Sequence, residues 1–123
     1  MKYQLDLTPE EEENALAVLQ PTGYRLLVAL AKTSEKVGSL YLPDSRRTDE
    51  DAASILAKVV AVGEDAYADA KRFPNGPYCE AGDIVMMASY SGRRIKIEDR
   101  EYRLINDDTV IAVVAQPEKV SRA

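Results

Sequence analysis

The stretch RIKIEDREYRLI, from Arg94 to Ile105, decides the fold class. Ile95 and Ile97 alternate with charged residues, and a second run of the same kind returns after a polar break at residues 98–100. Alternation with a period of two is typical of a strand with one buried face, and two such runs joined by a short polar turn predict a β-hairpin. This segment therefore indicates a β-rich domain.

Apolar runs on both sides of the hairpin predict further strands. Each run is short, and residues that favour turns lie between the runs. The runs are YRLLVALA (Tyr24 to Ala31), ILAKVVAVG (Ile55 to Gly63), the segment from Ile84 to about Ala88, and TVIAVVA (Thr109 to Ala115). Five or six short strands with frequent turns predict a small barrel or sandwich.

A helix start precedes the first strand, in LTPEEEENALAVL (Leu7 to Leu19). Thr8 is the predicted N-cap, Pro9 occupies the first helical position, and Glu11 stands where a capping box requires an acidic residue. We expect a helix of about two to three turns, ended by Pro21 and stable only if it packs on the domain. The alternative is a frayed tail. The apolar stripe for packing comprises Ala15, Leu16 and Leu19.

Two long insertions interrupt the strands. The first, KTSEKVGSLYLPDSRRTDEDAAS, covers residues 32–54, and loops beyond about 12 to 15 residues are usually functional or disordered. Its apolar tripeptide Leu40 to Leu42 suits either a short strand with one buried face or an anchor in a loop that orders on binding. In the second insertion, residues 64–81, the first half suits a helical turn, and the PNGP motif predicts a bend.

Composition limits the classes of function. The chain has 123 residues, 46% of them hydrophobic, which suits one domain. Its net charge of −5 opposes binding to nucleic acid. No apolar run approaches the roughly 20 residues of a membrane span, and the N-terminus lacks a signal peptide. We therefore expect a soluble, cytoplasmic protein without a membrane partner.

The residue types that carry most enzyme chemistry are sparse. The sequence has no histidine and one cysteine, Cys79, so an intrachain disulfide and the usual zinc sites are excluded. Neither a phosphate-binding G-x-x-x-x-G-K-[ST] motif nor a G-x-S-x-G nucleophile elbow occurs. The carboxylates cluster where solvated helix starts and turns place them. We predict no catalytic residues, no metal and no cofactor.

Taken in order, the segments resemble the GroES-type co-chaperonin family, in a phage-like variant. The matching pieces are PTGYRLLVAL, GSLYLPDS, AKVVAVG, AGDIVMMASYSG with the following IKI, and DDTVIAVV. The resemblance implies an all-β, GroES-like Greek-key β-barrel that assembles into a homo-heptamer. It further implies that the ring caps a GroEL-type chaperonin, which hydrolyses ATP while unfolded substrate protein is enclosed.

The resemblance also assigns a role to the first insertion. It implies a mobile loop whose apolar tripeptide docks on the apical domain of the chaperonin. Tyr41 departs from the aliphatic residue common at its position, and Ser39 replaces the second loop glycine. The implied partner-binding residues are Leu40, Tyr41, Leu42, Gly38, Ser39 and Pro43.

The ring would join the first strand, residues 24–31, to the last strand, residues 109–115, of the next subunit. The implied interface residues, or their immediate neighbours, are Leu26, Val28, Ile111 and Val113. Pairing at this contact would cover strand edges that otherwise invite aggregation.

The expected domain organisation has three parts. Residues 1–20 are an N-terminal extension, an addition to the family pattern. Residues 21–115 form the barrel with its mobile loop, 32–54, and a roof-like insertion, 64–81, and residues 116–123 form a tail. The second insertion shows little strand alternation, so the β-hairpin that builds a roof in many family members is not predicted.

Two alternatives remain open from the sequence. The first is a small-barrel adaptor that binds a peptide through Leu40 to Leu42 without forming a ring. The second is an enzyme, either with an unrecognised carboxylate site or as a barrel domain from a larger dehydrogenase. The complete loop and the absence of a dinucleotide fingerprint argue against the dehydrogenase.

Overall fold

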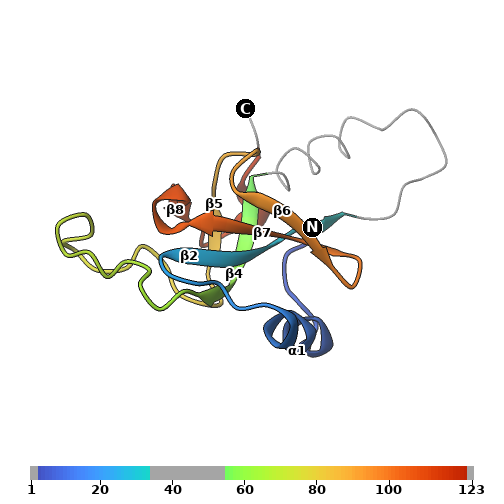
Figure 1. The fold of residues 1–123 in the computed structure, drawn as a ribbon. Helices are drawn as coiled ribbons and strands as arrows, with labels where there is room; N and C mark the ends of the chain where they lie inside the picture. The colour runs from blue at the N-terminus through green and yellow to red at the C-terminus, as the bar shows by residue number, and fades with distance from the viewer. Residues whose placement is uncertain (1–2, 34–54, 122–123) are drawn as a thin grey trace.

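The computed structural model describes residues 3–33 and 55–121 (Figure 1). In these ranges a six-stranded antiparallel sheet has the order β6-β7-β2-β4-β5-β8, and a separate two-stranded ribbon pairs β1 with β3. The strands are β1 (Tyr3–Gln4), β2 (Arg25–Leu30), β3 (Lys32–Thr33), β4 (Leu56–Val62), β5 (Ile84–Met86), β6 (Arg93–Ile97), β7 (Arg100–Asn106) and β8 (Ala112–Val113). The helices are α1 (Pro9–Val18) and two 3-10 turns, Asp107–Thr109 and Pro117–Lys119. The predicted all-β fold is confirmed.

The hairpin that decided the fold class is β6–β7. Ile97 pairs with Arg100, so only Glu98 and Asp99 form the turn. Both turn residues have positive φ, 50° and 69°, as a two-residue turn matched to the right-handed twist of a hairpin requires. The sequence predicted a turn over residues 98–100, but Arg100 belongs to β7.

The C-terminal strand is shorter than predicted. Residues 109–115 were expected to be extended, but only Ala112 and Val113 form β8, since Asp107–Thr109 wind into a 3-10 turn. The sequence analysis also missed β1 and β3. Two-residue strands are too short to show a period, so pattern alone cannot identify them.

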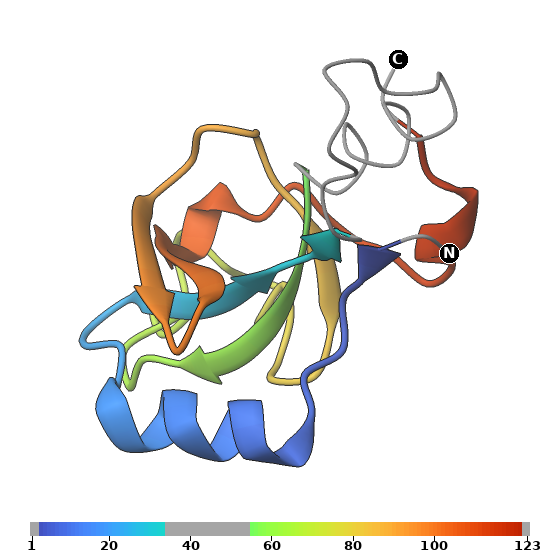
Figure 2. The ribbon, with the colours of Figure 1, turned by 90° about the vertical axis from the view of Figure 1, so that its right-hand side faces the viewer.

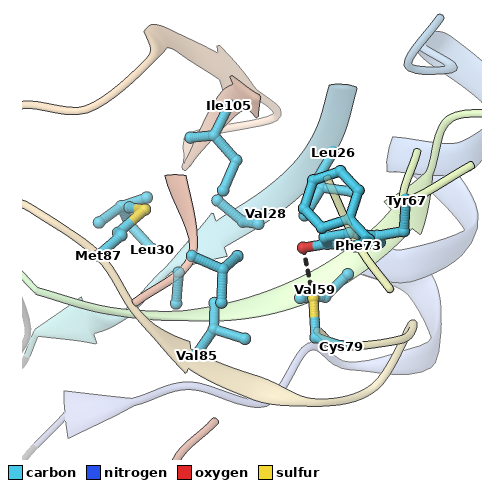
Figure 3. Close-up of a cluster of buried hydrophobic side chains, with 12 residues drawn as sticks. Leu26, Val28, Leu30, Val59, Tyr67, Phe73, Cys79, Val85, Met87 and Ile105 are labelled. Carbon is cyan, nitrogen blue, oxygen red and sulfur yellow. Dashed lines mark hydrogen bonds between the residues drawn. The ribbon is translucent and has the colours of Figure 1, made fainter. Parts of the chain in front are cut away.

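Strand β2 lies at the centre of the sheet and is buried on both faces. It pairs with β7 along one edge and with β4 along the other. Leu26, Val28 and Leu30 point into the main core, whereas Leu27 and Ala29 join a second cluster. Figure 3 shows the main core, with Leu30 beside Met87 at one end. A strand with two buried faces explains the nearly continuous apolar run from Leu26 to Leu30.

Helix α1 covers the second face of β2, and Figure 2 shows it lying along the sheet beside β4. The capping box is formed: the Thr8 hydroxyl accepts from the Glu11 amide at 3.1 Å, and the Thr8 amide donates to the Glu11 carboxylate at 2.9 Å. Ala15 is fully buried, and Leu16 and Leu19 pack against the second cluster. The prediction of a packed helix is confirmed, although the helix ends at Val18, before Pro21.

Arg100 ties the N-terminal segment to the sheet. Its side chain is 2% exposed. Nε and Nη2 donate to the Leu30 carbonyl at 3.1 and 3.0 Å, and Nη2 also donates to the Leu5 carbonyl at 3.2 Å. Nη1 lies 3.3 Å from Glu11 Oε1, so the buried positive charge faces a carboxylate. Removing that carboxylate would leave a buried charge uncompensated, which is costly.

Glu11→Gln should therefore destabilise the chain in a pH-dependent way. A hydrogen bond from the Thr8 amide and the Arg100 charge hold the pKa of Glu11 below its ordinary 4.5, although burial acts in the opposite direction. Because the pKa is lower in the folded than in the unfolded state, the ionised carboxylate stabilises the fold. This contribution to the free energy of unfolding is complete above the unfolded pKa and is lost as the pH falls through the folded pKa. At neutral pH we expect a loss of about 1 to 3 kcal/mol in the free energy of unfolding.

Denaturant unfolding at a series of pH values measures this. The difference between the wild type and Glu11→Gln should shrink as the pH falls below 4.5. Glu13→Gln, on the exposed side of the same helix, is the matched control and should change the free energy by less than about 0.5 kcal/mol. Equal losses in the two variants, or a loss in Glu11→Gln that is independent of pH, would show that the pair does not hold the segment.

Candidate functional site

The predicted partner-binding residues lie outside the part of the chain that the structure describes. Leu40, Tyr41 and Leu42 belong to residues 34–54, as do Gly38, Ser39 and Pro43. Their assignment stays a prediction. The residues on both sides of this segment are described, and they form the root from which it leaves the barrel.

Three elements meet at this root, which we define as Ala31 to Thr33 together with Ile55. Strand β3 pairs with β1, with Tyr3 opposite Thr33 and Gln4 opposite Lys32. Lys32 Nζ lies 3.9 Å from the Glu11 carboxylate. Ala31 on the outgoing side and Ile55 on the returning side both pack against a third apolar cluster, formed by Leu5 and Leu56.

Sequence reasoning missed the N-terminal contribution to the root. The signal was present in YQLDL, where Leu5 and Leu7 alternate with polar residues. Leu5 is buried against Leu56 at the start of β4. The short alternating run therefore reports a real contact with the sheet, although it is too brief for a strand prediction by itself.

The predicted subunit-interface residues divide into two groups. Leu26 and Val28 are fully buried in the chain's own core. Their assignment to a subunit contact, which allowed for their immediate neighbours, stays a prediction. Within the single chain, β2 pairs with β4 along one edge and with β7 along the other. Ile111 and Val113, in contrast, are 66% and 51% exposed.

Strand β8 presents an apolar edge. It pairs with β5 through Val113 opposite Val85 and Ala112 opposite Met86, and within the described ranges no strand pairs with its other edge. A groove of about 460 Å³ runs beside it. The groove is lined by Tyr78, Asp108, Val110, Ile111, Ala112 and Val113. An apolar edge strand next to a hollow is the kind of surface that soluble proteins normally cover or protect with charge.

The second insertion, residues 64–81, folds as turns, with neither a helix nor a strand assigned in it. Single hydrogen-bonded turns occupy its first half: the Ala68 amide donates to the Asp65 carbonyl at 3.1 Å, and the Phe73 amide donates to the Asp69 carbonyl at 2.8 Å. The segment builds no β-hairpin. In Figure 1 the insertion projects to the left, on the side opposite β3. Its inner part is a small aromatic cluster: the Phe73 ring lies 4.9 Å from that of Tyr67 and 5.0 Å from that of Tyr78. The buried Asp107 carboxylate anchors the cluster by accepting from the Tyr67 amide at 3.0 Å.

The lone thiol is structural. Cys79 Sγ lies 3.4 Å from the Tyr67 hydroxyl, and Figure 3 shows the pair beside Phe73 and Val59. Burial raises the pKa of the Cys79 thiol, which opposes formation of the nucleophilic thiolate. Among residues 3–33 and 55–121, no three His, Cys, Asp or Glu side chains gather into a metal site. The same ranges contain no helix long and apolar enough to cross a membrane.

Comparison with known proteins identifies the family. The family model described as chaperonin 10 Kd subunit matches residues 18–114. Co-chaperonin GroES of Lactobacillus delbrueckii subsp. bulgaricus is 33% identical over 99 residues, which cover 79% of this chain and 99% of that protein. Co-chaperonin GroES of Chlorobium luteolum is 31% identical over 98 residues, and that of Parageobacillus thermoglucosidasius is 29% identical over 102 residues. Both alignments again cover 79% of this chain, with 98% and 99% of the relative.

The match contains every strand of the six-stranded sheet and leaves out β1 and most of α1. The matched range also includes residues 34–54, where the sequence predicts the chaperonin-binding loop. The resemblance seen in the sequence is confirmed, and the chain belongs to the chaperonin 10 kDa subunit family, which includes the GroES co-chaperonins.

Proposed function

We propose that this chain is a cytoplasmic co-chaperonin that forms a ring of seven and caps a GroEL-type chaperonin. The chaperonin would hydrolyse ATP, and the chain itself would catalyse no reaction. The observation that carries the proposal is the family match over residues 18–114, together with alignments that cover 98% to 99% of the GroES relatives. A conserved role for the complete barrel and loop accounts for such a match better than a shared fold alone.

A head-to-tail contact between copies would build the ring. Such a contact closes into a ring when the rotation between subunits suits. One side would be β8, through Ile111 and Val113. The other side would be the connection from α1 to β2, where Val18 at the end of α1 and Tyr24 next to β2 are both exposed. Tyr24 lies two positions before Leu26, one of the interface residues expected from the sequence.

Docking on the chaperonin would use the apolar tripeptide Leu40 to Leu42. Each buried leucine contributes about 1.5 to 3 kcal/mol, from which the cost of ordering the loop must be subtracted, so a single loop would bind weakly. Seven tethered loops convert later contacts into intramolecular steps and give a stable cap. Docking would displace apolar substrate from the chaperonin, and burial of the substrate's own apolar residues would then favour its folding.

Ile111→Asp should break the ring and leave the fold of each subunit intact. The side chain is 66% exposed in the single chain, so its charge costs little until a neighbour buries it. Native mass spectrometry should show seven copies for the wild type and mostly single chains for the variant, with an unchanged circular dichroism spectrum. Tyr90→Asp, at a position that is 88% exposed in the loop between β5 and β6, is the control and should keep the ring. A wild type that is monomeric at micromolar concentration would refute the ring and favour the adaptor alternative.

Leu42→Ser should abolish capping without changing ring assembly or the melting temperature. Each loop loses only about 2 kcal/mol, but the loss recurs in every subunit. Leu40→Ser should behave alike, and Tyr41→Ala should be milder. Co-sedimentation with a GroEL-type chaperonin and ATP measures capping, and calorimetry measures stability. A sharp fall in melting temperature would make Leu42 a core residue, and full capping by Leu42→Ser would place the anchor elsewhere.

A further inference from the structure

The N-terminal segment is an addition to the family pattern that has become part of the barrel. The family match begins at residue 18, and the GroES relatives align over 79% of this chain but over almost all of their own length. Residues 3–17 therefore precede the shared part. They cover a sheet face that is otherwise apolar, since α1 packs on Leu27, Ala29 and Tyr102. The segment is thus an integral part of this fold and lies outside the part that the family model matches.

One side chain joins the segment to the root of residues 34–54. The Arg100 guanidinium donates to the Leu30 carbonyl at the end of β2 through both Nε and Nη2. The same group reaches the carbonyls of the N-terminal strand and the turn after it. Those carbonyls belong to Gln4 at 3.4 Å, Leu5 at 3.2 Å and Asp6 at 3.4 Å. Only the planar, forked donor set of an arginine satisfies so many acceptors at once.

The β1–β3 ribbon depends on this junction. It consists of two residue pairs, Tyr3 with Thr33 and Gln4 with Lys32, and so small a ribbon is marginal by itself. Arg100 holds residues next to both strands, and Glu11 compensates its charge while lying 3.9 Å from Lys32. The ribbon is therefore held by the Arg100 contacts beside β1, by the Arg100 contacts at the end of β2, and by the ion pair between Lys32 and Glu11. It lies immediately before residues 34–54.

We propose that the N-terminal segment is a clamp, locked by the positioning residue Arg100, that pre-orders the root of the chaperonin-binding loop and thereby raises the affinity of the ring for its chaperonin. The effect on affinity rests on the proposed function; the clamp itself does not. Ordering backbone before binding removes part of the entropy cost of binding. Because the saving recurs in each subunit, a small effect per loop becomes large for the ring.

Arg103 provides a matched control within the same strand. It is also buried in β7, but its Nη1 donates to the carbonyls of Ser89 and Ser91, in the loop that leads to β6. Arg100→Lys and Arg103→Lys both keep a positive charge and lose the forked geometry. Only the first should loosen the clamp.

The test compares the two variants with the wild type by hydrogen exchange and by chaperonin binding. In Arg100→Lys, backbone amides of residues 3–6 and 31–33 should exchange at least tenfold faster, and the ring should bind a nucleotide-loaded GroEL-type chaperonin at least fivefold more weakly. In Arg103→Lys, faster exchange should be confined to residues 87–92, with unchanged affinity. Native mass spectrometry should show intact rings in both. If Arg100→Lys does not fold, Glu11→Gln replaces it with the same expected pattern.

Three results would overturn the proposal, and they have different meanings. Unchanged exchange in Arg100→Lys would show that Arg100 locks nothing. Faster exchange with unchanged affinity would show that the clamp does not act on binding. A wild-type ring that fails to bind any GroEL-type chaperonin would refute the proposed function and the affinity effect with it, while the exchange comparison would still decide whether the clamp exists.

Discussion

The burial of β2 on both faces is the constraint on which the rest of the structure depends. Its pairing with β4 and β7 places the strand at the centre of the sheet, so its side chains alternate between two apolar clusters. The main core is covered by side chains from β4, β5 and β7 and by the aromatic residues Tyr67 and Phe73 of the second insertion. The other needs an external cover, which α1 supplies. An apolar face of this kind would be exposed without the N-terminal segment, and exposed apolar area is costly in water.

A buried charge secures that cover. Arg100 is almost fully buried. Removing a partner from a buried charge destabilises a protein by more than the intact interaction stabilises it, because the charge is left uncompensated. Its partners are main-chain carbonyls and one carboxylate, which makes the arrangement specific in geometry as well as in charge. The same group therefore connects three features: the helix that covers β2, the ribbon at the root of residues 34–54, and the hairpin that carries Arg100.

The sequence predicted the elements whose signals are local. The β6–β7 hairpin follows from alternation around a polar turn, and the capping box of α1 follows from Thr8 and Glu11. Features that depend on contacts between residues far apart in the chain could not be predicted from the sequence. Arg100 lies in a charged turn-like run and was read as part of the turn, whereas Leu5, one of its acceptors, stands 95 positions earlier. Likewise an apolar run such as residues 24–31 does not reveal whether a strand is central or at the edge of a sheet, and only the pairing with β4 and β7 shows that β2 is central.

A single measurement on the unmodified chain tests both proposed roles, ring formation and chaperonin binding. Its complex with a GroEL-type chaperonin, purified in the presence and absence of ATP, can be weighed by mass photometry. The account predicts that ATP produces a species heavier than the chaperonin by seven copies of this 13.6 kDa chain, or by twice that number when both ends are capped. A chaperonin whose mass does not change with ATP, or that gains isolated single copies, would contradict it.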